Sequence, residues 1–161
     1  MKIVTTLLIV LASGALSAQT SRITNIVVAI GKAEVRGQPD SKMQLTVGYE
    51  NTNTEQLTPI AKCPLVERWN SNKMRDNEFL LECDDQGCID SLKSNSGYME
   101  IILTPSLRSD LTLQYELRFS YIDGDAGEKT ITRTREIKIP RGSPTFKVNW
   151  DFNEKGTVAT Q

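Results

Sequence analysis

In residues 111–122, LTLQYELRFSYI, apolar and polar side chains alternate from Leu111 to Tyr121. Successive side chains of a β-strand point to opposite faces of the sheet, so this pattern predicts a strand with one buried and one exposed face. The apolar side chains of the run are Leu111, Leu113, Tyr115, Leu117, Phe119 and Tyr121. A sheet with one apolar face must pack against a second layer, and this requirement limits the folds that the chain can adopt.

Other segments follow the same period. The runs 43–50 (MQLTVGYE) and 145–152 (TFKVNWDF) alternate in the same way. Less regular strands are predicted at 23–35, 78–83, 98–103 and 129–139, and Gly, Pro and Asp mark turns at 36–41, 123–128 and 140–144. The best helix candidate, 64–76, is equally well interpreted as a structured loop. One-faced strands separated by turns predict an all-β, single-domain antiparallel β-sandwich.

The first residues, MKIVTTLLIVLASGALSAQT, have the order of a secretory signal peptide: a positive charge at Lys2, an apolar stretch and small residues. The apolar stretch is too short for a good membrane span. We therefore expect a signal peptide at 1–18, with cleavage after Ala15 as the alternative to Ala18. A β-sandwich domain at 19–152 and a flexible C-terminal tail at 153–161 would follow. This organisation predicts a secreted, extracellular protein without membrane insertion.

Histidine is absent, and 19 basic residues nearly balance 20 acidic ones. Without histidine, Ser-His-Asp and Cys-His catalysis and the commonest zinc sites are excluded. The small net negative charge does not predict binding to nucleic acid. A carboxylate pair for glycoside hydrolysis would have to come from the strands, and no pattern selects one among Glu50, Glu78, Glu82, Glu100 and Glu116. We expect no enzyme activity and no catalytic, cofactor or metal residues.

The run ECDDQGCID, residues 82–90, holds two of the three cysteines. The spacing is neither the C-x-x-C of redox sites nor that of common zinc knuckles, and a secreted protein favours disulfides. We predict a disulfide between Cys83 and Cys88 that clamps a hairpin, with arms FLLEC and CIDSL and the turn DDQG between them. Pairing of Cys63 with either of the other cysteines is the alternative. The prediction leaves Cys63 as the odd thiol.

Residues 111–140, in which Tyr115 is followed by alternating apolar residues, a Gly/Asp turn and another strand, resemble the penultimate hairpin of immunoglobulin-like, fibronectin type III and cadherin domains. The resemblance implies an immunoglobulin- or fibronectin-III-like general architecture, with Tyr115 as the tyrosine-corner residue. It implies no calcium function, because cadherin-type ligands are not matched elsewhere. The acidic turn DGDAGE at 123–128 also fails the EF-hand pattern, and we interpret it as a solvated hairpin turn.

A group of basic residues surrounds an aromatic residue in the least regular segment: Arg68, Trp69, Lys73 and Arg75. Trp and Arg are over-represented at binding hot spots, and binding residues often lie on loops held by a rigid scaffold. We predict that these four residues contact a partner; the alternative is that Trp69 fills the core from a loop. The small size, secretory start and lack of a catalytic set are typical of secreted effector or recognition proteins of microbes, including virulence effectors. The predicted function is therefore binding to a protein partner.

Two other function classes stay open from the sequence. A small carbohydrate-binding or carbohydrate-active sandwich would expose aromatic residues on one sheet face, and Trp150 is the candidate. A structural or adhesive subunit would pair an unprotected edge strand with another chain. Lys129, Arg133 and Arg135 share one face of a predicted strand and are interpreted as edge-strand charges that block unwanted pairing, with a grip on an acidic partner as the alternative.

Overall fold

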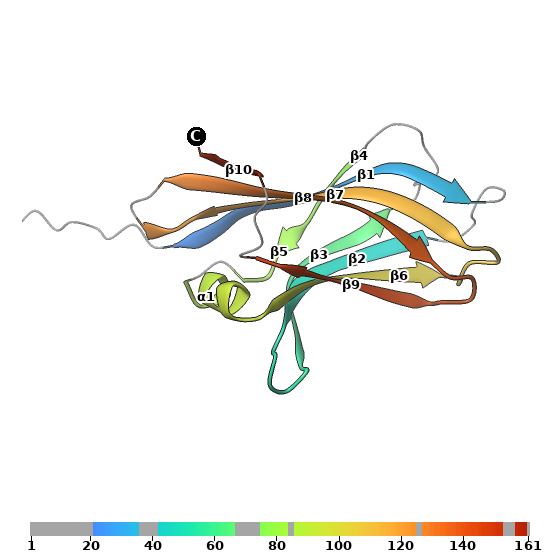
Figure 1. The fold of residues 1–161 in the computed structure, drawn as a ribbon, viewed down its shortest axis with the longest axis horizontal. Coiled ribbons are helices and arrows are strands. Elements are labelled where there is room, and N and C mark those ends of the chain that lie inside the picture. Colours follow the sequence, from blue (N-terminus) through green and yellow to red (C-terminus); the bar gives the residue numbers. More distant parts are fainter. Residues whose placement is uncertain are drawn as a thin grey trace, which may run out of the picture.

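The structure is a computed structural model that describes residues 21–35, 42–66, 75–83, 86–124, 127–152 and 157–160. Two five-stranded antiparallel sheets pack face to face in this part of the chain, and one short helix lies at one end (Figure 1). The all-β sandwich predicted from the alternating runs is confirmed. The predicted signal peptide at 1–18 lies outside the described residues.

Sheet A has the strand order β10-β8-β7-β1-β4, and sheet B has the order β5-β3-β2-β6-β9. The elements in chain order are β1 (Arg22–Val35), β2 (Lys42–Glu50), β3 (Leu57–Val66), β4 (Arg75–Glu78), β5 (Leu80–Leu81), α1 (Gln86–Ser94), β6 (Ser96–Thr104), β7 (Leu111–Ile122), β8 (Glu128–Ile139), β9 (Thr145–Asp151) and β10 (Thr157–Thr160). The hairpin predicted within 111–140 is present, because β7 pairs with β8 along its whole length, from Leu111 opposite Ile139 to Ile122 opposite Glu128.

The core lies between the two sheets. The apolar face of β7 is buried along its whole length, as its alternation predicts, and sheet B contributes buried side chains such as Leu45 and Ile101. Phe119, Trp150 and Phe152 form an aromatic cluster, with ring centroids 5.6 Å apart for Phe119 and Phe152. Burying one Leu or Phe side chain stabilises a protein by roughly 1.5–3 kcal/mol, so this interior dominates the stability of the fold.

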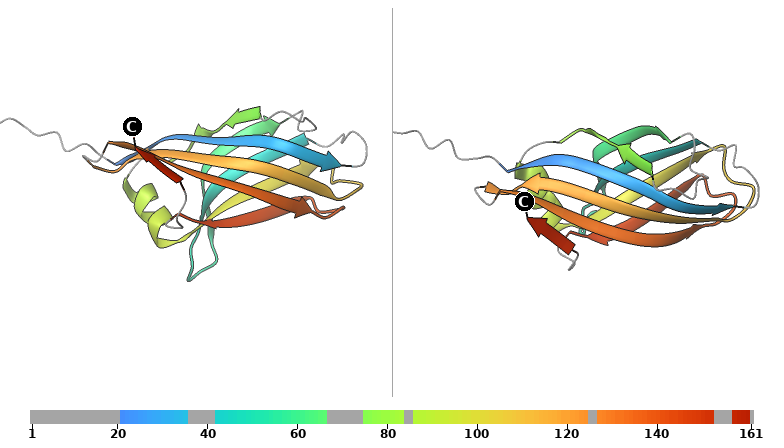
Figure 2. Two further views of the ribbon diagram at one scale, coloured as in Figure 1. Left: turned by 45° about the horizontal axis from the view of Figure 1, so that its top comes forward. Right: turned by 90° about the horizontal axis from the view of Figure 1, so that it is seen from above.

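Helix α1 closes the end of the sandwich that lies away from the Val35 end of β1 (Figure 2). Cys88, Ile89 and Leu92 lie on one side of the helix and are buried in the core, because a helix brings residues three and four apart onto one face. The prediction that CIDSL forms the second arm of a hairpin is therefore wrong. The disulfide between Cys83 and Cys88 is present, with the two Cα atoms 6.2 Å apart. Cys83 lies two residues after the end of β5, so the disulfide ties the chain that follows β5 to Cys88 in α1.

Strand β3 was not predicted, because Pro59 and Pro64 argue against a central strand. The structure accommodates Pro59 at a register shift, opposite Gly48, and β5 pairs with β3 only at Ala61 and Lys62. The helix alternative for 64–76 is wrong where the structure describes that segment, because β3 continues to Val66 and β4 begins at Arg75. Within the segment predicted as a flexible tail, Thr157–Thr160 form β10 and pair with β8.

Candidate functional site

The loops 105–110 and 140–144 lie together at the end of the sandwich opposite α1 (Figure 1). The first connects β6 to β7 and the second connects β8 to β9, so both cross from one sheet to the other. Arg108, Ser109, Asp110 and Arg141 line an open hollow of about 420 Å³ between these loops. We call this hollow the arginine pocket.

One hydrogen bond between the two loops, and one between β6 and the second loop, hold the arginine pocket in shape. The N–H of Gly142 donates to the carbonyl of Leu107 at 2.9 Å, and the N–H of Leu103 donates to the carbonyl of Pro144 at 2.8 Å. Leu107 is buried in the core and anchors the first loop. Gly142 has φ +77°, a left-handed conformation that favours glycine, although a Cβ there would meet no atom within 4 Å. The loops are therefore fixed by backbone contacts, whereas the arginine side chains are exposed.

Asp110 supports the wall of the pocket with both carboxylate oxygens. Oδ1 accepts the N–H of Arg141 at 3.0 Å, and Oδ2 lies 3.0 Å from Nζ of Lys138. The hydrogen bond from the Arg141 backbone, followed by the contact with Lys138, lowers the pKa of Asp110 below its ordinary value of 3.8. Asp110 is therefore ionised at neutral pH, and its charge is directed at the loop backbone and Lys138.

The guanidinium groups of Arg108 and Arg141 form no salt bridge with any described residue. Both side chains are exposed, and both line the same hollow. A planar guanidinium presents several N–H donors in a fork that matches carboxylate and phosphate groups. Two of them beside one hollow can bind an anion.

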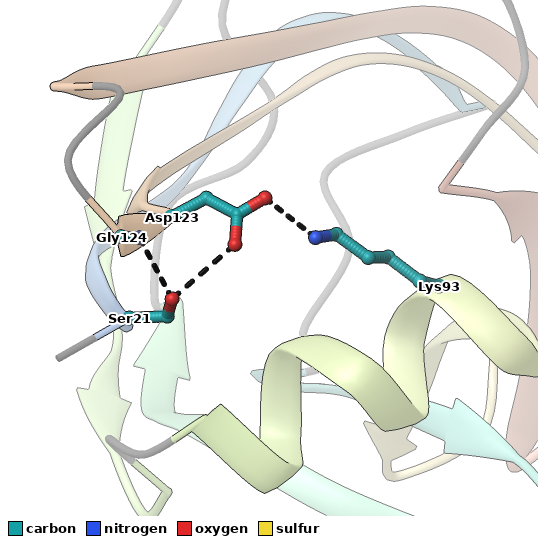
Figure 3. A network of polar contacts seen from close by, with 4 residues as sticks. All are labelled: Ser21, Lys93, Asp123 and Gly124. Atoms are coloured by element: carbon teal, nitrogen blue, oxygen red, sulfur yellow. Dashed lines mark hydrogen bonds and ion pairs between the residues drawn. The ribbon is translucent and has the colours of Figure 1, made fainter.

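The polar groups at the α1 end are paired with one another. Asp123, the first residue of the acidic turn, accepts a hydrogen bond from Ser21 at 3.2 Å and lies 2.6 Å from Nζ of Lys93 on α1 (Figure 3). The N–H of Gly124 donates to Oγ of Ser21 at 2.9 Å. The hydrogen bond from Lys93 is the main cause of a lowered pKa at Asp123. This network ties the first described residue, the turn after β7 and the helix together, so Asp123 has a structural role.

A second paired network crosses the outer face of sheet B. Nζ of Lys147 on β9 lies 2.8 Å from the Glu50 carboxylate on β2, and Asn149 donates to the same carboxylate at 3.2 Å. Strands β2 and β9 flank β6 on either side, so the bridge passes over β6, where Tyr98 lies on the face opposite Met99. Tyr98 is only 2% exposed, although it is absent from the core between the sheets.

The ring of Tyr98 packs against Gly48, where an added Cβ would come 2.7 Å from Cε1 of the tyrosine. Burial, together with the nearby carboxylates of Glu100, Glu50 and Glu82, raises the pKa of Tyr98 to about 12. The phenol therefore stays protonated at neutral pH and cannot act as a base. The structure brings three of the strand glutamates to this face, but Glu50 is engaged by Lys147 and Glu82 by Lys62 at 3.0 Å.

The predicted partner-binding residues fall mainly outside the described part of the chain. Arg68, Trp69 and Lys73 lie in the segment 67–74, and Arg75 is the first residue of β4, whose backbone alone is described there. Strand β3 ends at Val66, which pairs with Met43 of β2. The neighbouring residue of β2, Lys42, pairs with Thr104, the last residue of β6. Strand β3 therefore ends at the same end of sheet B as the arginine pocket.

Burial decides two other hypotheses drawn from the sequence: sugar binding by Trp150 and binding of an acidic partner by Arg133. Trp150 is 4% exposed and packs against Phe119, so it offers no open face to a sugar. Arg133 is also buried, and its guanidinium donates to the carbonyls of Asp151 and Phe152 at 3.4 and 3.5 Å. It therefore joins β8 to the end of β9 and is not available to an acidic partner. Cys63 is outside the disulfide and buried.

The arginine pocket has no signature in the amino-acid sequence. Arg108 and Arg141 lie in separate turn-rich segments, LRSD and PRGSP, and neither segment alone indicates a site. Only the place of the two segments in the order of strands could have indicated the pocket, because in an antiparallel sandwich the β6–β7 and β8–β9 connections can meet at one end. Only the strand order shows that they do.

Within the described ranges, no group of three or more His, Cys, Asp or Glu side chains is arranged to hold a metal ion. No helix in that part of the chain is long and apolar enough to cross a membrane. Comparisons with protein-family models, with curated proteins and with solved structures gave no match. Evidence about function therefore comes from the chemistry of the chain's own residues.

Proposed function

We propose that this chain is a secreted, non-enzymatic binding protein that recognises a protein partner through the loop end of its sandwich. The observation that carries the proposal is the arginine pocket, where two exposed guanidinium groups without a salt-bridge partner among the described residues line one hollow. Arg is among the residues that contribute most to binding energy at protein interfaces. The secretory order of the first residues supports an extracellular place of action.

The scaffold suits a binding role because it presents loops on two paired sheets. The long β7–β8 hairpin and the β6–β9 pair fix the strand ends from which loops 105–110 and 140–144 emerge. Binding sites are often carried on loops that a rigid framework positions. Preformed loops also lose little conformational entropy on association, and this favours affinity. An effector or recognition protein of this kind needs no catalytic residues.

A displayed library of random peptides tests this proposal with three forms of the mature protein. The first is wild type, the second carries Arg108→Ala with Arg141→Ala, and the third carries Arg22→Ala with Lys129→Ala, which removes two positive charges near the α1 end. We expect wild type and the Arg22/Lys129 variant to enrich the same binders, and the Arg108/Arg141 variant to lose them. Equal enrichment by all three forms, or no enrichment by wild type, would contradict the proposal.

A further inference from the structure

We infer that the arginine pocket takes a single carboxylate group, and that the matching partner segment is an acidic peptide. This inference rests on the proposed function and adds the chemistry of the ligand. The lining residues supply two guanidinium charges and one carboxylate charge, Arg108 and Arg141 against Asp110, which leaves a net charge of +1. One carboxylate would neutralise that charge. The chain as a whole has a formal net charge of −1, so the pocket is locally opposite in sign.

Asp110 forms no salt bridge with either guanidinium group, although it lines the same pocket and its charge attracts that of Arg141. Both of its oxygens are already engaged, Oδ1 by the N–H of Arg141 and Oδ2 by Lys138. The Arg141 residue therefore uses its backbone N–H for Asp110, and its side-chain donors remain for a ligand. Ser109 adds a hydroxyl to the lining, which can donate one more hydrogen bond to a carboxylate oxygen.

The same aspartate favours a carboxylate over a phosphate. A guanidinium fork binds either group, so the two arginines alone do not discriminate between them. A phosphate ester, however, carries about −1.5 to −2 charges at neutral pH, and it would sit beside the ionised Asp110 in the pocket wall. Like charges at close range disfavour binding. A carboxylate carries one charge and meets less repulsion.

The size and openness of the pocket fit a side chain of a peptide. A hollow of about 420 Å³ has room for one Asp or Glu side chain. Its walls come from two loops that cross between the sheets, so a peptide can lie over the end of the sandwich and insert one Asp or Glu side chain. Because the contacts are exposed and charged, salt will screen them, and affinity will fall as ionic strength rises.

Nuclear magnetic resonance titration tests the inference through the side-chain Nε–Hε signals of Arg108 and Arg141. The probes are an acetylated, amidated peptide of three glutamates, the same peptide with three glutamines, and inorganic phosphate. We expect both arginine signals to move with the glutamate peptide, and affinity at least about tenfold weaker for the glutamine peptide. Arg108→Ala or Arg141→Ala should each weaken the glutamate peptide about fivefold, as for loss of one exposed charge-assisted contact.

The matched control is the Arg22→Ala, Lys129→Ala variant, which should bind the glutamate peptide as wild type does. Tighter binding of phosphate than of the glutamate peptide would overturn the carboxylate assignment. Unmoved arginine signals with every probe would overturn the pocket as an anion site. If the library binders depend on Arg108 and Arg141 but the glutamate peptide does not bind, only the carboxylate inference fails. If the glutamate peptide does not bind and the library binders do not depend on Arg108 and Arg141, the proposed function fails as well.

Discussion

The two ends of the sandwich use charged residues in opposite ways. At the α1 end, Lys93 pairs with Asp123, Ser21 donates to the same carboxylate, and the buried face of the helix closes the core. At the loop end, Asp110 is paired with Lys138, but Arg108 and Arg141 line a hollow without a salt bridge to any described residue. A charge that is satisfied within the fold stabilises it, whereas an exposed charge beside a hollow is available to a ligand.

This difference separates stability from binding. Changes at the α1 end should lower the free energy of unfolding and leave the affinity of the folded protein for an acidic peptide intact. Changes to the two arginines should do the reverse. Each variant below is therefore measured twice, by urea unfolding and by binding of the three-glutamate peptide under conditions in which the protein is folded.

The largest effect is expected from Leu92→Ala in α1. Leu92 is fully buried, so the substitution removes apolar contacts and leaves a cavity at the closed end. We expect the free energy of unfolding to fall by about 2–5 kcal/mol. Peptide affinity of the folded fraction should stay at the wild-type value. A loss of stability below about 1 kcal/mol would show that α1 does not close the core as described.

Removal of the disulfide should have the next largest effect. Cys83 and Cys88 are only five positions apart, so the cross-link restrains a short loop in the unfolded chain. The Cys83→Ala, Cys88→Ala variant should lose about 2 kcal/mol of stability. Reduced wild-type protein is the control, because it loses the cross-link but keeps both side chains. Equal stability of oxidised and reduced protein would contradict this expectation.

A smaller effect is expected from Asp123→Asn, which keeps the shape of the side chain and removes its charge. The variant should lose about 1 kcal/mol or less at pH 7. Because folding lowers the pKa of Asp123, its contribution is complete above the ordinary value of 3.8 and disappears as pH falls through the lowered value. The variant should therefore lose less stability than wild type between pH 5 and pH 2. Parallel pH profiles would contradict the role of Lys93 and Ser21.

The smallest effect on stability is expected from Arg108→Ala with Arg141→Ala. Both side chains are exposed, and neither forms a salt bridge with a described residue. The free energy of unfolding should therefore change by no more than about 0.5 kcal/mol. The Asp110→Asn variant is the comparison, because it loosens the contacts to Lys138 and to the Arg141 backbone. A large loss of stability in the arginine variant would mean that these side chains hold the loops together and are structural.

The fold was predictable where one physical rule dominated. The alternation of 111–121 specified β7, and the runs 43–50 and 145–152 specified β2 and β9 nearly to their ends. Strand β3 was missed because its prolines argue against a strand, and only the bulge at Pro59 and the short partner β5 make them acceptable. Helix α1 was missed because Gly87 and the two cysteines indicate a turn, although Cys88, Ile89 and Leu92 have helical spacing.

The candidate site was less predictable than the fold. The pairing of Cys83 with Cys88 followed from their spacing, which is local. The arginine pocket depends on two loops that are far apart in the sequence and meet only because β6, β7, β8 and β9 end together. The paired state of Asp123 likewise depends on Ser21 and Lys93, which are distant in the chain. Contacts of this kind are set by topology, which composition and periodicity do not specify.

Binding of the three-glutamate peptide to two variants, in one titration series against wild type, tests the central claim most directly. If the ends divide the work as described, Arg108→Ala with Arg141→Ala should bind more than about fivefold more weakly, because the one carboxylate loses both of its guanidinium contacts. Lys93→Ala, which breaks the network at the other end, should bind as tightly as wild type while unfolding at lower urea concentration. Wild-type affinity in the arginine variant, or lost affinity in the Lys93 variant, would contradict the account.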